Sequence, residues 1–182
     1  MVTELLSEAF NDNLSVNYIV RQDEKLRQRI YALMEYSFEV CFLFGKIWLS
    51  EDRKACALVL YPHQKKNTLK SIWLDIKLIF TAIGLDGIQK ALDREAKIKA
   101  KQPKEPMAYL WFICVGSLYQ HYGTGSKLLK CVIADAVQQN LPVYLETSTE
   151  RNLLWYERYG FVEYDKLDLS YTLHFLKHEI IK

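Results

Sequence analysis

The first third of the chain alternates between helical and strand-like hydrophobic patterns. Leu26, Ile30, Leu33 and Met34 recur at helical spacing in DEKLRQRIYALMEYSF, with Asp23 as a candidate N-cap. The next segment, EVCFLFGKIWLS, is rich in aromatic and β-branched residues, and KACALVLYP follows after the turn SEDR. The pattern therefore predicts a helix followed by a β-hairpin.

Residues 67–101 predict two helices. The first has a wide apolar face, which we expect to cover the sheet, and the second, IQKALDREAKIKAK, is more polar. The apolar face consists of Leu69, Ile72, Trp73, Ile76, Ile79, Phe80 and Ile83. The segment QPKEP then breaks the pattern.

The second half of the chain predicts strand, helix, strand, short helix and two closing strands. The apolar strand MAYLWFICV and the strand VYLETS enclose a helix, and together they form a βαβ unit at residues 107–148. Strands joined in this way run parallel, whereas their neighbours look antiparallel. We therefore expect one mixed α/β, or α+β, domain spanning 182 residues.

Composition narrows the possible partners and the compartment. The chain carries 24 basic and 22 acidic residues, a formal net charge of +2, which gives no broad electrostatic case for nucleic acid or a membrane surface. No secretory signal pattern or membrane-length apolar run is found. The four cysteines form no CxxC pair, and neither they nor the four histidines have metal-ligand spacing. We expect a cytoplasmic monomer or homodimer with reduced thiols and no metal.

Two glycines, Gly123 and Gly125, stand between the apolar strand and the following helix, in LYQHYGTGSKLL. A helix N-terminus exposes unpaired N–H groups and partial positive charge, and glycines let an anion approach the backbone closely. The stretch therefore predicts a phosphate site. A helix start with glycines for tight packing is the alternative.

Three phosphate motifs can be compared with this stretch. GTGSK lacks the spacing of a Walker A loop, and Leu128 occupies the third glycine position of GxGxxG. The pattern [Q/R]xxGx[G/A] fits QHYGTG at residues 120–125 fully.

That pattern resembles the pyrophosphate loop of the GNAT superfamily of acetyltransferases. NLLWYERYGF also resembles a family signature, through Asn152, Tyr156, Gly160 and Phe161. The resemblance covers most of the chain in order, except a helical insertion at about residues 63–106. It implies a mostly antiparallel sheet with a central parallel pair, flanked by helices, in a single domain over residues 1–182.

The resemblance also implies an N-acetyltransferase that uses acetyl-CoA as cosubstrate. The acceptor would be an amine, on either a small molecule or a peptide, and it would attack the thioester directly. Asn152 and Tyr156 would contact the cofactor, and Tyr156 would protonate the departing thiolate. The oxyanion would meet a backbone amide near Val115. The pantetheine arm would pair with Ile113, Cys114 and Val115. The pyrophosphate would lie on the amides of Gln120, His121, Tyr122, Gly123, Thr124, Gly125 and Ser126.

Several positions depart from the family pattern. Tyr109 stands where the protein-lysine branch has a glutamate base; Glu146 on the next strand is the nearest alternative, so the base stays unassigned. His121 replaces a frequent glycine. We interpret Cys114 as inert packing, and the lysines of residues 97–104 as a solvated face.

Two questions stay open at this stage. The insertion either covers the sheet or caps an acceptor pocket lined by Trp73 and Trp111. The protein is either an enzyme or a non-catalytic GNAT-fold sensor or scaffold for acyl-CoA. The retained pair Asn152 and Tyr156 favours the enzyme, and the missing glutamate at Tyr109 slightly favours the binder.

Overall fold

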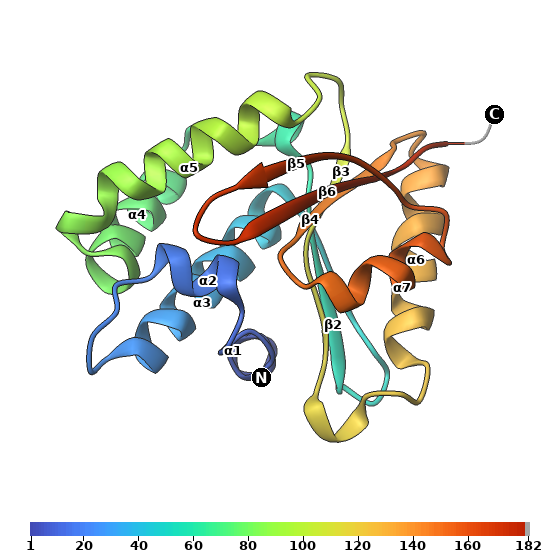
Figure 1. Cartoon of the computed structure of the whole chain (residues 1–182), viewed down its shortest axis with the longest axis horizontal. Coiled ribbons are helices and arrows are strands. Elements are labelled where there is room, and N and C mark those ends of the chain that lie inside the picture. The colour runs from blue at the N-terminus through green and yellow to red at the C-terminus, as the bar shows by residue number, and fades with distance from the viewer. Residues whose placement is uncertain (181–182) are drawn as a thin grey trace.

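The computed structural model describes residues 1–180. A six-stranded sheet in the order β1-β2-β3-β4-β6-β5 separates two groups of helices (Figure 1). The strands are β1 (Gly45–Leu49), β2 (Ala55–Leu60), β3 (Ala108–Val115), β4 (Val143–Thr147), β5 (Val162–Asp168) and β6 (Thr172–His178). The helices are α1 (Val2–Ala9), α2 (Leu14–Ile19), α3 (Leu26–Phe44), α4 (Leu69–Leu78), α5 (Ile88–Lys101), α6 (Thr124–Gln138) and α7 (Leu153–Glu157).

Among the strands of residues 1–180, only the central pair, β3 and β4, is parallel; all other neighbouring strands are antiparallel. This confirms the mixed fold class and the βαβ unit expected from the sequence. In Figure 1, α6 and α7 lie to the right of the sheet, whereas α1 to α5 lie to its left. No helix among residues 1–180 is both long and apolar enough to cross a bilayer.

The predicted hairpin of β1 and β2 is confirmed, but the boundary before it was wrong. Residues 39–44 continue α3 instead of beginning a strand, because Val40, Cys41 and Phe44 extend the buried helical stripe. Asp23 is not the N-cap: it precedes α3 by three residues, and its carboxylate accepts hydrogen bonds from the Lys25 amide at 3.0 Å and Arg29 Nε at 2.8 Å. It therefore holds the turn before the helix.

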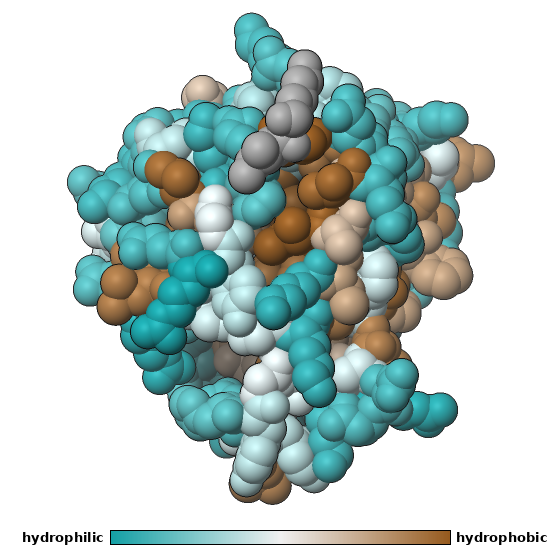
Figure 2. Space-filling view, turned by 90° about the vertical axis from the view of Figure 1, so that its right-hand side faces the viewer, coloured by the Kyte–Doolittle hydropathy of each residue, from teal (hydrophilic) through white to brown (hydrophobic). Residues whose placement is uncertain are grey.

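Two cores fill the two faces of the sheet. On one face α6 and α7 pack against β2, β3 and β4, with Leu129, Leu145 and Phe161 almost fully buried. On the other face α1 and α3 cover β2 and β3 around Met34 and Leu58, and α5 lies along β5. Figure 2 looks onto the side of α6 and α7, which is largely hydrophilic, with an apolar area in its upper half and smaller ones at its left and right.

The segment between β2 and β3 differs from the expectation that its first helix covers the sheet. α4 packs on α3 through Ser71, Leu74 and Leu78. A π-helical turn (Ile79–Ile83) follows, and Gly84 ends it with φ of +79°. Most of the predicted apolar face of α4 therefore points away from the protein interior.

Candidate active site

The parallel pair separates soon after it begins. β3 and β4 are paired only at Ala108 with Val143 and at Tyr109 with Tyr144. Beyond these residues the two strands are no longer paired with each other by main-chain hydrogen bonds, although β3 continues to Val115. Unpaired strand edges of this kind can accept an extended, amide-bearing ligand.

A β-bulge in β3 lies next to this separation. Leu58 of β2 is opposite Phe112 and Val59 is opposite Leu110, so Trp111 is the extra residue. The bulge at Trp111 lies two residues before Ile113, the first residue of the segment expected to pair with the pantetheine arm. After it, Ile113 and Val115 turn toward α6, whereas Phe112 and Cys114 turn toward α1 and α3.

The glycine-rich loop delivers free backbone donors to the end of this opening. Gly123 is the N-cap of α6, with φ of +81°, and Lys127 N makes the first helical bond to its carbonyl at 3.0 Å. No side chain caps the helix. The N–H groups of Thr124, Gly125 and Ser126 are thus directed out of the helix start, the usual geometry of an anion site.

The two glycines are needed for different reasons. A Cβ at Gly123 would contact nothing within 4 Å, so only its left-handed backbone favours glycine. A Cβ at Gly125 would lie 3.1 Å from Val115 Cγ2, so this glycine allows α6 to approach the end of β3 closely. The structure is therefore compatible with both interpretations of this stretch. Gly123 fits an anion site, and Gly125 fits tight packing between α6 and β3.

The rest of the loop is held from two sides. Trp155 Nε1 on α7 donates to Ser126 Oγ at 3.2 Å. Gln120 Nε2 reaches back to the carbonyl of Val115 at 3.3 Å. His121 has φ of +70° and is exposed, as is Tyr122. Sequence reasoning missed Trp155, because nothing in NLLWYERYGF distinguishes a loop-holding tryptophan from a core one.

Asn152 lies just before α7 and Tyr156 lies near its end, and both have uncommitted polar groups. The Tyr156 ring is buried, 4.8 Å from the Trp155 ring and 5.5 Å from Phe161. Its hydroxyl makes no hydrogen bond to any residue of 1–180, and burial raises its pKa above the usual tyrosine value. Asn152 is the N-cap of α7, but its side chain does not make the capping bond. Both groups are free to contact a ligand.

The separation of β3 and β4 is also the place where Tyr109 meets Glu146. The Tyr109 hydroxyl donates to Glu146 Oε2, and Gln102 Nε2 at the end of α5 donates to Oε1 at 2.8 Å. Burial raises the pKa of Glu146 above the ordinary glutamate value, and the two hydrogen bonds and the charge of Arg94 offset this only partly. Burial, with the charge and hydrogen bond of Glu146, raises the pKa of Tyr109 well above its usual value.

The opening thus has different chemistry on its two faces. Tyr156 belongs to the core under α6 and α7. Tyr109 packs against the core under α1 and α3, and Glu146 alternates with Leu145, which faces α6, so it points to the same opposite side. A phenol and a carboxylate therefore flank the opening from opposite faces of the sheet.

The family model described as the acetyltransferase (GNAT) family matches residues 84–161, the stretch that contains α5, β3, the loop, α6, β4 and α7. This match covers fewer than half of the 182 residues, and it supports a likeness to the GNAT superfamily over that stretch. Its sheet, with one parallel pair opening beside the loop, is the fold of the acetyltransferases to which it is similar. Family and fold leave the substrate open.

Solved structures extend the fold comparison over the whole chain. A Corynebacterium glutamicum protein described as histone acetyltransferase HPA2 and related acetyltransferase is 20% identical, with a TM-score of 0.68 over 100% of this chain and 91% of that one. Arylalkylamine N-acetyltransferase 2 from Aedes aegypti is 14% identical, with a TM-score of 0.65 over 99% and 93%. The C-terminal condensation domain of Ebony, solved with beta-alanyl-dopamine, is 9% identical, with a TM-score of 0.70 over 98% and 92%.

Proposed function

We propose that this protein is an N-acetyltransferase in which acetyl-CoA occupies the opening between β3 and β4 and an amine attacks its thioester directly. The observation that carries the proposal is the carboxylate of Glu146, bonded to Tyr109 at the opening and opposite the free phenol of Tyr156. One face thus offers a base and the other an acid. The whole chain would act as one domain.

The cosubstrate would be held by main-chain groups. The free amides from Gly123 to Ser126 would bind the pyrophosphate, together with those of the loop from Gln120 onward. The unpaired edge of β3 over Ile113, Cys114 and Val115 would pair with the amides of the pantetheine arm, and Asn152 would add a side-chain contact. A solved NatC complex, with a TM-score of 0.54, contains CoA and a peptide, which supports a fold of this type binding CoA.

Glu146 is our candidate for the general base that the sequence left unassigned. A base is effective when its pKa approaches the working pH, and burial moves this carboxyl in that direction. Its position next to Tyr109 also explains how a chain without glutamate at residue 109 keeps a carboxylate at the opening. Tyr109 would orient the base, rather than act as one.

The proton and electron movements balance without a covalent enzyme intermediate. Glu146 takes a proton from the amine as its nitrogen forms a bond to the acetyl carbonyl carbon. The oxyanion of the tetrahedral intermediate would accept a hydrogen bond from a backbone amide near Val115. As the C–S bond breaks, Tyr156 donates its proton to the CoA sulfur. Burial keeps this phenol protonated at neutral pH.

Arylalkylamines, in which the amine is attached to an aromatic ring through an alkyl chain, are the first acceptor class to test, ahead of peptides. On the face of Glu146, the rings of Tyr109 and Trp111 lie 6.3 Å apart, and Phe10 packs against Phe112 at 5.0 Å. Such rings favour an aromatic acceptor. Of the similar folds, the Aedes aegypti protein is described as an arylalkylamine N-acetyltransferase, and the Ebony domain was solved with beta-alanyl-dopamine.

The second candidate function is a non-catalytic acyl-CoA sensor. One observation favours it: Glu146 already accepts hydrogen bonds from both Tyr109 and Gln102, as a purely structural glutamate would. Calorimetric titration with acetyl-CoA and with CoA, followed by an amine panel measured by release of free thiol, separates the two. Thiol release accelerated by one amine class supports the enzyme. Binding without release supports the sensor, and absence of binding overturns both.

A further inference from the structure

α4 exposes an apolar surface that no other part of residues 1–180 covers. We call it the α4 stripe. Its members are Leu69 (89% exposed), Ile72 (48%), Trp73 (58%), Ile76 (48%) and Phe80 (65%). The first four recur at helical spacing along one side of α4, opposite the side that packs on α3, and Phe80 continues the row onto the π-helical turn that follows. In Figure 1 this helix lies at the outer left of the molecule, far from α6 and α7.

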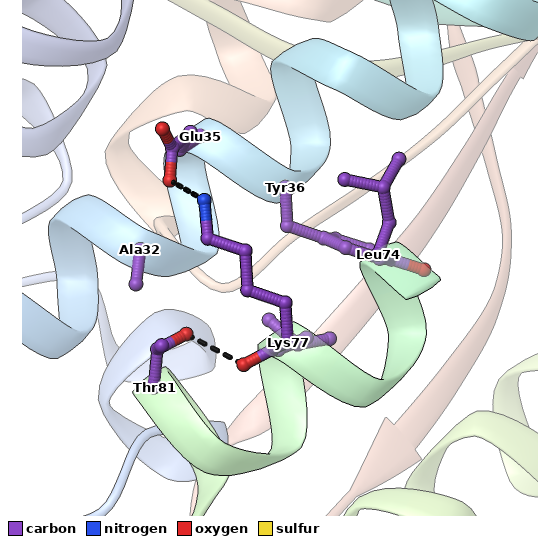
Figure 3. A pocket seen from close by; sticks show the side chains of 7 residues that line it. Ala32, Glu35, Tyr36, Leu74, Lys77 and Thr81 are labelled. Carbon is purple, nitrogen blue, oxygen red and sulfur yellow. Dashed lines mark hydrogen bonds and ion pairs between the residues drawn. The ribbon is translucent and has the colours of Figure 1, made fainter. Parts of the chain in front are cut away.

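The rotation of α4 is fixed by polar contacts with α3. Lys77 Nζ pairs with Glu35 at 2.7 Å (Figure 3), and Lys70 Nζ pairs with Glu39 at 2.9 Å. On the other flank, the Tyr36 hydroxyl donates to Asp75 at 2.7 Å. These contacts, together with buried Leu74, hold the stripe outward, so it does not fold back onto the protein.

The stripe is large for the free surface of a monomer. A large side chain has a surface of about 150–250 Å². Multiplied by the exposed fractions of the five members of the stripe, this gives roughly 600 Å² of exposed apolar surface. That is the upper limit of the largest patch on a typical monomeric protein, about 300–600 Å². Two such surfaces face to face would bury roughly 1,200 Å², the lower limit for a stable interface.

We propose that α4 pairs with α4 of a second copy of this chain, in an antiparallel arrangement about a two-fold axis. The axis would pass between Trp73 and Ile76, because this position makes the stripe complementary to itself. Leu69 would then face Phe80 of the second copy, and Trp73 would face its Ile76. Each contact joins a larger ring to a smaller aliphatic side chain.

Charge also favours a second copy. Lys70, Lys77 and Asp75, which flank the stripe, are already bonded to α3 within the same chain. The two lysines are paired with glutamates of α3 and so offer little free charge to a charged partner, whereas Asp75 accepts a hydrogen bond from the neutral Tyr36 hydroxyl and keeps its charge at the edge of the stripe. The proposal concerns a surface on α4, so it does not depend on the proposed enzymatic function.

The test is the mass of the full chain in solution, measured by light scattering and by sedimentation over a concentration series into the tens of micromolar. We expect a dimer for the wild type. Ile76→Glu should give a monomer, because it places a carboxylate against Trp73 of the second copy. Leu92→Glu is the matched control: Leu92 is 59% exposed on α5, outside the stripe, and its variant should remain a dimer.

A charge pair tests the register itself. The double variant Trp73→Lys with Ile76→Glu should recover dimer relative to Ile76→Glu alone, because each lysine faces a glutamate of the second copy. A monomeric wild type overturns the proposal, and so does a dimer that Ile76→Glu leaves intact. Co-sedimentation of a monomeric wild type with anionic phosphatidylserine vesicles would assign the stripe to a membrane surface instead. Circular dichroism of each variant checks that it is folded.

Discussion

The Tyr109 hydroxyl donates a hydrogen bond to the Glu146 carboxylate at the point where β3 and β4 separate. Tyr109 is the last residue of β3 that pairs with β4, and Glu146 lies two residues beyond its partner Tyr144. The bond therefore crosses the opening at its narrow end. It joins a residue that departs from the family pattern to the residue that we propose as the base.

Glu146→Gln should lower kcat by about 10²–10⁴-fold, because the amide keeps the shape of the side chain but cannot accept a proton. In the pH–rate profile of the wild type, kcat should rise through a pKa above that of an ordinary glutamate. This rising limb of the profile should be absent in the variant. Steady-state thiol release across pH measures both. Tyr109→Phe, which should shift the limb without removing the activity, is the control.

Glu146→Gln should also change how the free energy of unfolding depends on pH. A carboxyl whose pKa is raised in the folded state stabilises the fold below its unfolded pKa, and that contribution is lost as pH rises through the folded pKa. At neutral pH, Glu146→Gln should therefore have an unfolding free energy equal to or above that of the wild type. Denaturant titrations at pH 4 and pH 7 measure this. A marked loss of stability at neutral pH would indicate that Glu146 is structural.

Tyr156→Phe should reduce turnover and leave the affinity for CoA nearly unchanged, because only the proton donor is lost. The ring still packs between Trp155 and Phe161. Single-turnover kinetics and calorimetry measure the two quantities separately. Tyr159→Phe, a neighbouring tyrosine that contacts Trp155 at 5.8 Å, should change neither. Normal turnover in Tyr156→Phe would exclude the general-acid role.

Gly123→Glu should abolish CoA binding, because it places a carboxylate beside the free amides of the loop. Gly123→Asn is the matched control: asparagine tolerates positive φ, and the site has room for its Cβ, so binding should persist. Calorimetric titration with CoA compares the two. Equal affinity in both variants would remove the loop from the cofactor site.

Trp155→Phe should weaken CoA binding about fivefold, because the loop loses its bond from Nε1 to Ser126 Oγ, and such a bond contributes about 1 kcal/mol. Ser126→Ala should have a similar effect. The double variant should be no weaker than either single variant, since both remove the same bond. Additive losses in this cycle would mean that the two residues act independently.

Local patterns were sufficient for most of the elements and for the uncapped start of α6. The periodicity of residues 107–148 predicts strand, helix and strand, and a βαβ unit can only place its strands parallel. Likewise, Gly123 before an uncapped helix predicts free amides whatever the rest of the fold does. These features depend on residues close together in the chain, so the sequence alone determined them.

The tertiary structure decided three things that depend on distant residues. Glu146 acquires its raised pKa from burial and meets Tyr109 only where β3 and β4 diverge. Trp155 reaches Ser126 only because α7 folds against α6. The apolar periodicity of α4 predicted a core face, but contacts with α3 turn that face to solvent. Periodicity shows that a helix has two sides, and only its packing partners determine which side is buried.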